Sequence, residues 1–411
     1  MVSLISSFRS RILLILFILF APLSYAQQPY VILISLDGFR WDYCNRGVTP
    51  NIDKLIETGV KASSLQPVFP TKTFPNHYSI VTGLYPENHG IIFNHFNDPY
   101  TNRFFAIWDS AEVRDAWWYR GEAIWETLRI EGIKSASYFW PGSGVDKEIK
   151  RPDYVYYYVP DDPPINKVIA AIDWLQFPYD KRPHLIKLYF STTDGAGHYF
   201  GPVHKGMDLT IASIDSTLGL MLSGLENIGM RDSVNIILVS DHGITDVSTD
   251  KAINIEEMLT DYKCAYSNYG PVMMIELNKD EIDEVYDILK KNENHFTVYR
   301  KENIPEYLHF KNNPYISELL LIAELGWSVY ANKDLQRMKP KTFNGNHGYD
   351  HTELDMHGIF IASGPVFKNN FSTGTLNCLD VYPLLCKIFN VPPNANIDGR
   401  LDRIEFILNN N

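Results

Sequence analysis

Acidic residues and histidines follow three apolar runs of the chain, at the points where strands are expected to end. They are Asp37 after residues 31–36, Asp194 and His198 after residues 185–190, and Asp241 and His242 after residues 234–239. In open α/β sheets, sites form outside the carboxyl ends of the strands, so we expect these side chains to meet. Gathered carboxylates repel one another unless cations bind them, and carboxylate oxygens with imidazole nitrogens suit zinc.

Each of these residues also has a structural explanation. An Asp after a strand commonly caps a helix or forms a turn, and His198 alone is compatible with an ordinary surface histidine. Three such clusters after three separate apolar runs favour a metal site over unrelated caps. Glycine flanks each cluster, which allows the backbone to approach a ligand closely.

Thr73 is the candidate nucleophile. Pro75 suits the first turn of a helix, and Thr73 stands just before it. The N-terminus of such a helix offers N–H groups and the positive end of a dipole to a phosphate. The alternative is that Thr73 only caps the helix, and spacing alone does not separate the two explanations.

The elements that must position these residues alternate along the chain. The apolar runs at 31–36, 185–190, 234–239 and 358–362 predict buried strands, and amphipathic patterns at 52–56, 123–130 and 209–225 predict helices. This alternation indicates an α/β fold with a mainly parallel sheet and helices on both faces. Residues 271–330 break the rhythm, with a strand at 272–277, a helix at 281–291, a strand at 296–300 and two short strands within 319–329. This pattern predicts a small inserted α+β subdomain.

The N-terminus and the composition limit the class of protein. Arg9 and Arg11 precede an apolar run at 12–23, which is followed by a short segment that ends in Ala26. This pattern predicts a signal peptide over residues 1–26, with cleavage after Ala26, and a mature domain over 27–411. The alternative, a membrane anchor, needs roughly 20 apolar residues, so we expect no membrane span after cleavage. The formal net charge of −12 with interspersed charges predicts no nucleic-acid-binding surface.

Export would place the protein in the periplasm or outside the cell, where disulfides form. The chain has four cysteines, Cys44, Cys264, Cys378 and Cys386. Their spacing fits no zinc motif, and three pairings are open.

Several segments together resemble the nucleotide pyrophosphatase/phosphodiesterase family of the alkaline phosphatase superfamily. They occur in the family's order and cover nearly the whole mature chain. The segments are 37–40 (DGFR), 72–78 (KTFPNHY), 82–85 (TGLY), 89–90 (HG), 140–142 (WPG), 194–198 (DGAGH), 201–202 (GP), 240–243 (SDHG) and 347–350 (HGYD).

The resemblance implies an alkaline-phosphatase-like core and two Zn²⁺ per chain. One zinc ion would be held by Asp37, Thr73, Asp241 and His242, and the other by Asp194, His198 and His347. Position alone favoured His357, which precedes a predicted strand. The family's His-Gly-Tyr-Asp pattern favours His347 instead.

The resemblance also implies roles in substrate binding. Asn94 matches the family residue that hydrogen-bonds a nonbridging phosphoryl oxygen, and Phe74, Tyr158 and Tyr189 match aromatic positions that line the nucleotide pocket. For Tyr158 a structural role is the alternative, because the tyrosines at 154, 156 and 157 crowd around it.

The frame around Thr73 separates the chain from sister families. Sulfatases carry Cys or Ser in a Cys/Ser-x-Pro-x-Arg frame, whereas here His77 stands at the Arg position and Thr73 at the nucleophile position. Monoesterases of the superfamily typically use Ser with extra positive groups, and the sequence shows no clear equivalent.

The function implied by the resemblance is a secreted zinc-dependent hydrolase of nucleotide phosphodiester or phosphoanhydride bonds. It would act through a phosphothreonine intermediate and release nucleoside 5′-monophosphates. The first alternative is a phospholipid-headgroup or choline phosphodiesterase of the same family. The second is a catalytically inactive extracellular binding protein, against which the presence of all expected ligands argues.

Overall fold

A computed structural model describes residues 28–332 and 344–409 of the chain. Its centre is an eight-stranded sheet in the order β19-β2-β18-β9-β1-β8-β6-β7. The strands are β1 (Tyr30–Leu36), β2 (Gly59–Ala62), β6 (Ser135–Tyr138), β7 (Tyr154–Tyr156), β8 (Leu185–Phe190), β9 (Val234–Val239), β18 (Phe360–Ser363) and β19 (Phe371–Thr373). All neighbours run parallel except β18, which is antiparallel to both β2 and β9. The predicted α/β class with a mainly parallel sheet is confirmed.

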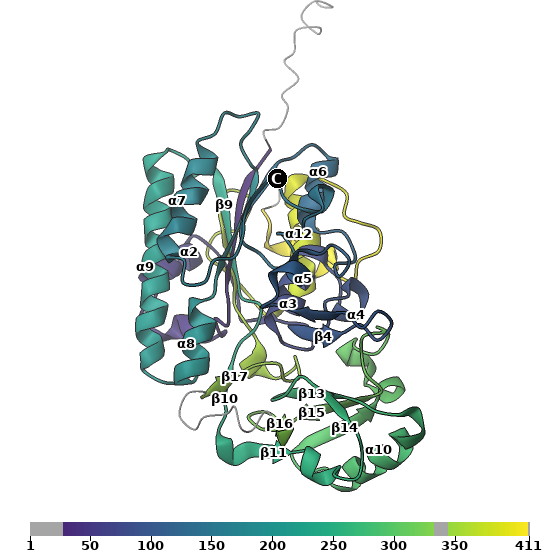
Figure 1. Cartoon of the computed structure of the whole chain (residues 1–411). Helices are drawn as coiled ribbons and strands as arrows, with labels where there is room; N and C mark the ends of the chain where they lie inside the picture. The colour runs from purple at the N-terminus through teal and green to yellow at the C-terminus, as the bar shows by residue number, and fades with distance from the viewer. Residues whose placement is uncertain (1–27, 333–343, 410–411) are drawn as a thin grey trace, which may run out of the picture.

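Helices cover both faces of this sheet (Figure 1). One face carries α2 (Pro50–Glu57), α7 (Pro164–Leu175), α8 (Thr192–Phe200) and α9 (Gly206–Asn227), and the other carries α3 (Thr73–Thr82), α5 (Ser110–Arg114), α6 (Ile124–Ile130) and α12 (Val381–Phe389). Strand β1 explains the arrangement, because its side chains alternate between two buried clusters. Ile32 and Ile34 belong to the α9 side, and Val31 and Leu33 to the α3 side. A strand that is buried on both faces has a nearly continuous apolar sequence, which is why residues 31–36 form a single apolar run.

A second, smaller sheet lies beside the main one (Figure 1). Its order is β12-β13-β15-β14, all antiparallel, with strands β12 (Ala265–Ser267), β13 (Val272–Glu276), β14 (Phe296–Arg300) and β15 (Leu319–Ala323). Helix α10 (Ile282–Lys291) packs with it around a separate apolar cluster. The subdomain boundaries at 271 and 330 stay a prediction. The small sheet also takes in β12, before residue 271, and β16 (Ser328–Tyr330) pairs with β11 (Ala252–Asn254) instead of joining it.

The chain also forms short strand pairs and a short helix outside the two larger sheets. They are β3 (Leu65–Gln66) with β20 (Leu376–Asn377), β4 (His95–Asn97) with β5 (Phe104–Ala106), β10 (Thr245–Asp246) with β17 (Gly345–Asn346), and the helix α4 (Pro86–His89).

The predictions about export concern the N-terminal segment, membrane spans and the cysteines. The predicted signal peptide, residues 1–26, lies outside the described residues. Within the described ranges, no helix is both long and apolar enough to cross a membrane. All four cysteines are free thiols, so none of the open disulfide pairings is formed in this structure.

Candidate active site

The carboxyl ends of three neighbouring strands bring the predicted acidic and histidine residues together. Strand β1 lies between β8 and β9 and is parallel to both. Asp37 therefore emerges between Asp194, in the helix that follows β8, and Asp241, which follows β9. Gly38 permits this approach, because its φ is +65° and a Cβ there would lie 2.9 Å from the Cα of Asp194.

Thr73 joins this cluster from the opposite layer. It is the first residue of α3, so the expectation that it stands just before the helix was off by one position. Its hydroxyl lies 3.4 Å from Nε2 of His242, and its side chain is largely buried. Asn94 lies next to it, because Oδ1 of Asn94 accepts a hydrogen bond of 3.0 Å from the backbone N–H of Phe74.

Asp37, Asp241 and His242 form the first group that could hold a metal ion. Nε2 of His242 lies 3.4 Å from Oδ1 of Asp37 and 3.1 Å from Oδ2 of Asp241. All three residues are buried. The threonine hydroxyl at 3.4 Å from the same Nε2 completes the four residues predicted for one metal site.

A second group surrounds Asp194. Its Oδ1 lies 3.4 Å from Nε2 of His198 and 3.6 Å from Nε2 of His347. Asp194 and His347 also form a candidate metal group with His242. The structure thus brings together all seven residues predicted as metal ligands.

His357, the alternative to His347, lies outside this cluster. Its Nδ1 is 2.9 Å from the hydroxyl of Ser64, and its Nε2 is 3.1 Å from the backbone carbonyl of His351. Both ring nitrogens are therefore engaged away from the acidic residues.

Backbone carbonyls fix the orientation of the clustered imidazoles. Nδ1 of His347 is 2.7 Å from the carbonyl of Thr71, and Nδ1 of His198 is 2.7 Å from the carbonyl of Gly345. Nδ1 of His242 is likewise 2.9 Å from the carbonyl of Gly243. A carbonyl can only accept, so each Nδ1 carries the hydrogen and each Nε2 presents its lone pair to the acidic side chains.

The electrostatics of the cluster fit a cation. Burial, followed by the charges of neighbouring Asp residues, raises the pKa of both Asp37 and Asp241 well above the usual range. Oδ1 of Asp37, Oδ1 of Asp194 and Oδ2 of Asp241 are buried and accept no hydrogen bond from the protein. Burial also lowers the pKa of His242 and His347, which keeps both neutral and able to ligate. Unpaired buried carboxylates are costly, and cations bound among them would remove that cost.

Two residues at the site were not assigned a role from the sequence. His77 lies one helical turn after Thr73, with Nδ1 2.8 Å from the carbonyl of Thr73 and 3.2 Å from Oδ2 of Asp241. The Nζ of Lys72 donates a 2.5 Å hydrogen bond to the carbonyl of His347, and burial lowers the pKa of Lys72 to about 8. The spacing of four residues between Thr73 and His77 was the available signal, because it places both on one helix face.

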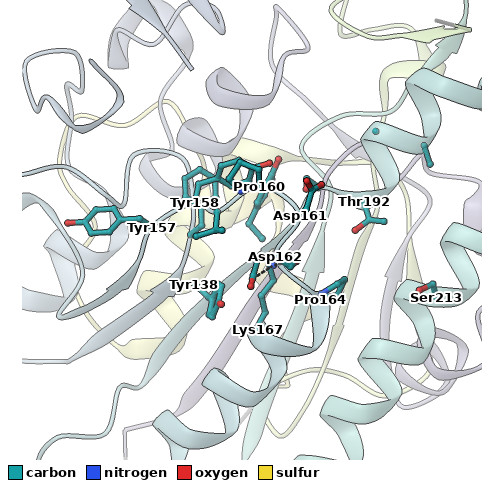
Figure 2. A pocket seen from close by; sticks show the side chains of 16 residues that line it. Tyr138, Tyr157, Tyr158, Pro160, Asp161, Asp162, Pro164, Lys167, Thr192 and Ser213 are labelled. Carbon is teal, nitrogen blue, oxygen red and sulfur yellow. Dashed lines mark hydrogen bonds and ion pairs between the residues drawn. The ribbon is translucent and has the colours of Figure 1, made fainter. Parts of the chain in front are cut away.

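A cavity of about 540 Å³ lies beside the cluster, because Tyr189 lines it and also contacts Asp37. Figure 2 shows the residues that line this cavity. Tyr158 and Tyr189 line it, and the hydroxyl of Tyr189 donates a 2.5 Å hydrogen bond to Oδ2 of Asp37. Phe74 does not line this cavity. Its side chain is 5 % exposed and packs edge-on against Phe105 at a centroid distance of 6.0 Å. Two of the three predicted aromatic residues, Tyr158 and Tyr189, therefore line the same cavity.

Comparisons with known proteins show which family the chain resembles. The family model for type I phosphodiesterase/nucleotide pyrophosphatase matches residues 31–350. The chain is 35% identical over 396 residues to human ectonucleotide pyrophosphatase/phosphodiesterase family member 1, covering 93% of this chain but only 42% of that protein. It is 35% identical over 386 residues to the bis(5′-adenosyl)-triphosphatase enpp4 of Xenopus laevis, covering 94% of this chain and 83% of that protein.

A solved structure extends the agreement to three dimensions. Murine ectonucleotide pyrophosphatase/phosphodiesterase 5, in an inactive threonine-to-alanine variant in complex with AMP, superposes with a TM-score of 0.86 at 33% identity. The match covers 93% of this chain and 100% of that one. The chain therefore belongs to the type I phosphodiesterase/nucleotide pyrophosphatase family of enzymes, which hydrolyse phosphodiester and pyrophosphate bonds.

Proposed function

We propose that the protein is a secreted, zinc-dependent nucleotide phosphodiesterase in which Thr73 is the nucleophile. The observation that carries the proposal is the position of the Thr73 hydroxyl, 3.4 Å from Nε2 of His242 and beside carboxylate oxygens that have no hydrogen-bond partner. A hydroxyl nucleophile must be activated by a neighbouring group, and a metal ion bound by these residues would activate Thr73.

The donor set suits two zinc ions. Asp37, Thr73, Asp241 and His242 would hold one ion, and Asp194, His198 and His347 the other. When bound, the ions would supply Lewis-acid chemistry, lowering the pKa of the threonine hydroxyl and stabilising charge on the phosphoryl oxygens.

The chain's own residues would then carry a double displacement. The Thr73 oxygen forms a bond to phosphorus while the bond to the leaving group breaks, giving a phosphothreonine diester. Water then forms a bond to the same phosphorus, and the bond to Thr73 breaks. The products are the leaving group, which takes up the proton lost from Thr73, and a nucleoside 5′-monophosphate; Thr73 regains its hydroxyl hydrogen from the attacking water.

Asn94 and His77 would orient this chemistry. The amide oxygen of Asn94 is held by the N–H of Phe74, so its NH₂ group is the end available to a nonbridging phosphoryl oxygen. His77 would be a positioning residue, because its Nδ1 contacts both the Thr73 carbonyl and Asp241, while its Nε2 lies 2.7 Å from the hydroxyl of Ser35.

Nucleotides are the proposed substrates. The murine relative binds AMP, and the Xenopus relative is named as a bis(5′-adenosyl)-triphosphatase. The aromatic wall made by Tyr158 and Tyr189 would hold the nucleoside next to Asp37. The names of the ectonucleotide relatives, together with the apolar N-terminal run, support action outside the cytoplasm.

One observation favours the choline-type alternative. Tyr157 and Tyr158 share the cavity wall with Asp161 and Asp162, and Lys167 is paired with Asp162 at 2.9 Å. The charge of Asp161 therefore leaves this wall with a net negative charge. Aromatic faces with an acidic residue also suit a quaternary ammonium group.

A substrate panel on the purified mature protein tests the proposal. With zinc present, we expect AMP to be released from ATP and from diadenosine triphosphate, at kcat/KM values far above that for glycerophosphocholine. Preferred cleavage of glycerophosphocholine would support the alternative. Hydrolysis of none of the three would support the inactive binding protein.

A further inference from the structure

The β4–β5 hairpin presents two different faces beside the site. His95 pairs with Ala106 and Phe96 pairs with Phe105. Since side chains alternate along a strand, Phe96 and Phe105 point to one face, where both are fully buried. The opposite face carries Phe104, which is 42 % exposed.

Three rings lie together on or beside this open face: His95, Phe104 and Trp108, called here the ring cluster. The ring of Trp108 is 5.2 Å from that of His95 and 6.3 Å from that of Phe104, measured between centroids. His95 and Phe104 are 6.2 Å apart. Trp108 remains 69 % exposed, so most of its indole can contact another molecule.

The ring cluster is continuous with the catalytic region. Asn94 directly precedes His95, its side chain accepts the N–H of Phe74, and its carbonyl accepts the N–H of Ile107 at 3.0 Å. Asn94, the residue proposed to bind the phosphoryl group, therefore contacts both strands of the hairpin. It directly precedes β4, and it hydrogen-bonds Ile107, which directly follows β5. In Figure 1, β4 lies close to α3, which begins at Thr73.

The positive charge of Lys72 lies near both the second metal group and His95 of the ring cluster. Nζ of Lys72 donates to the carbonyl of His347, and its charge also acts on His95. Burial, assisted by that charge, lowers the pKa of His95 to about 4, so its ring is neutral at neutral pH. A polyphosphate that passes Lys72 would therefore reach a neutral aromatic surface.

We propose that the ring cluster binds the nucleobase of the leaving group when the substrate is a dinucleoside polyphosphate. This inference rests on the proposed function. Every nucleobase has a π-face that stacks on aromatic side chains without a requirement for sequence. The cavity at Tyr158 would hold the nucleoside whose phosphoryl group is transferred to Thr73. The ring cluster would hold the second nucleoside, with Lys72 beside the phosphates that join them.

Two substrates that differ only in the leaving group test this assignment. ATP and diadenosine triphosphate both transfer an adenosine 5′-phosphoryl group, but the leaving group is pyrophosphate in one and ADP in the other. We expect Trp108→Ala to lower kcat/KM for diadenosine triphosphate about tenfold, in the range found for loss of one base–aromatic stack. The value for ATP should stay within about twofold, because pyrophosphate has no base to stack. Trp108→Phe should retain most of the activity on diadenosine triphosphate.

A binding measurement provides a readout other than turnover. In the Thr73→Ala background, Trp108→Ala should weaken the binding of diadenosine triphosphate about tenfold and leave the binding of AMP unchanged. Tyr100→Ala is the matched control, because Tyr100 lies in the turn of the same hairpin and is 79 % exposed but is not part of the ring cluster.

The outcomes separate the two proposals. Equal losses on ATP and diadenosine triphosphate, or no loss on either, would overturn the role of the ring cluster while leaving the phosphodiesterase intact. The same selective loss in Tyr100→Ala would overturn it too, because the effect would belong to the hairpin as a whole. A wild-type protein that cleaves neither substrate would overturn the proposed function itself.

Discussion

His242 and His347 stack face to face, with ring centroids 3.6 Å apart and ring planes 13° from parallel. Each ring donates its Nδ1 hydrogen to a different backbone carbonyl and turns Nε2 toward the acidic residues. The stack joins the group around Asp37 to the group around Asp194. The two candidate metal groups have His242 in common and therefore lie next to each other, which suits two neighbouring ions.

The first prediction concerns the nucleophile. Thr73→Ala should remove nearly all turnover, because no hydroxyl would remain beside His242, while the fold and most bound metal stay intact. Thr73→Ser should keep part of the activity, since a hydroxyl remains. Steady-state kinetics with circular dichroism and metal analysis would check this. Near wild-type rates in Thr73→Ala would exclude the covalent mechanism.

The second prediction concerns the metal. Elemental analysis should find about two zinc ions per chain, and EDTA should inactivate the protein until zinc is restored. His347→Ala should lose far more activity and zinc than His357→Ala, because His357 bonds Ser64 and the carbonyl of His351 instead of facing the cluster. Full activity of a verified metal-free sample, or the reverse order of the two histidine variants, would contradict the assignment.

The third prediction concerns the preference for diesters. The nitrophenyl ester of thymidine 5′-monophosphate should be cleaved at least about a hundredfold faster than nitrophenyl phosphate in kcat/KM, which needs only roughly 2.7 kcal/mol of differential transition-state binding. Contacts with the nucleoside can supply this, because binding energy from a remote group lowers the barrier at phosphorus.

Tyr158→Ala should reduce that preference by slowing the nucleotide diester alone. Tyr179→Ala is a suitable control, since Tyr179 is 57 % exposed and Tyr158 is 50 % exposed, but only Tyr158 lines the cavity. Equal rates on both nitrophenyl substrates in the wild-type protein would indicate a phosphomonoesterase.

The fourth prediction concerns Lys187, which is buried in the centre of β8. Its Nζ has no hydrogen-bond partner and lies 4.6 Å from the centroid of the Trp125 ring. Burial lowers the pKa of Lys187 from 10.5 to about 7. Between these two values the unfolded chain holds a proton that the folded chain has released. The free energy of unfolding should therefore rise with pH, by about 1.4 kcal/mol per unit at most.

Lys187→Met should reduce this slope, leaving the contribution of Lys72, whose pKa is also lowered by burial, to about 8. It should raise the stability near pH 7, because the amine of Lys187 then no longer needs to be buried. Urea unfolding at pH 7, 8 and 9 measures the effect, with Lys181→Met as an exposed control. An unchanged slope in Lys187→Met would show that Lys187 does not titrate in this range.

Much of the site could be predicted from the order of residues alone. A strand buried on both faces produces a continuous apolar run, so the ends of β1, β8 and β9 were visible in the sequence. Parallel strands bring their carboxyl ends to one edge, so the meeting of Asp37, Asp194 and Asp241 followed from topology. The family pattern then favoured Thr73 as a nucleophile over a simple helix cap, and His347 over His357 as a ligand.

Other features depended on packing between segments that are distant in sequence. His357 precedes the apolar residues of β18, which made it a candidate ligand by position. Only the fold places its ring against the hydroxyl of Ser64, some 290 residues earlier in the chain. Strand β18 is antiparallel to β9 although its composition resembles that of the parallel strands. Strand direction is set by the path of the chain between strands, which local patterns do not encode.

The sequence by itself determined which residue types could do the chemistry and which strand ends would carry them, because burial and backbone hydrogen bonding impose a local periodicity that can be read residue by residue. Only the tertiary structure decided that Phe74 packs against Phe105 rather than lining the cavity with Tyr158, that Lys72 bonds the carbonyl of His347, and that the aromatic residues of the hairpin separate into a buried and an open face. Those outcomes follow from competition among side chains for the same space, and that competition exists only once distant segments have packed together.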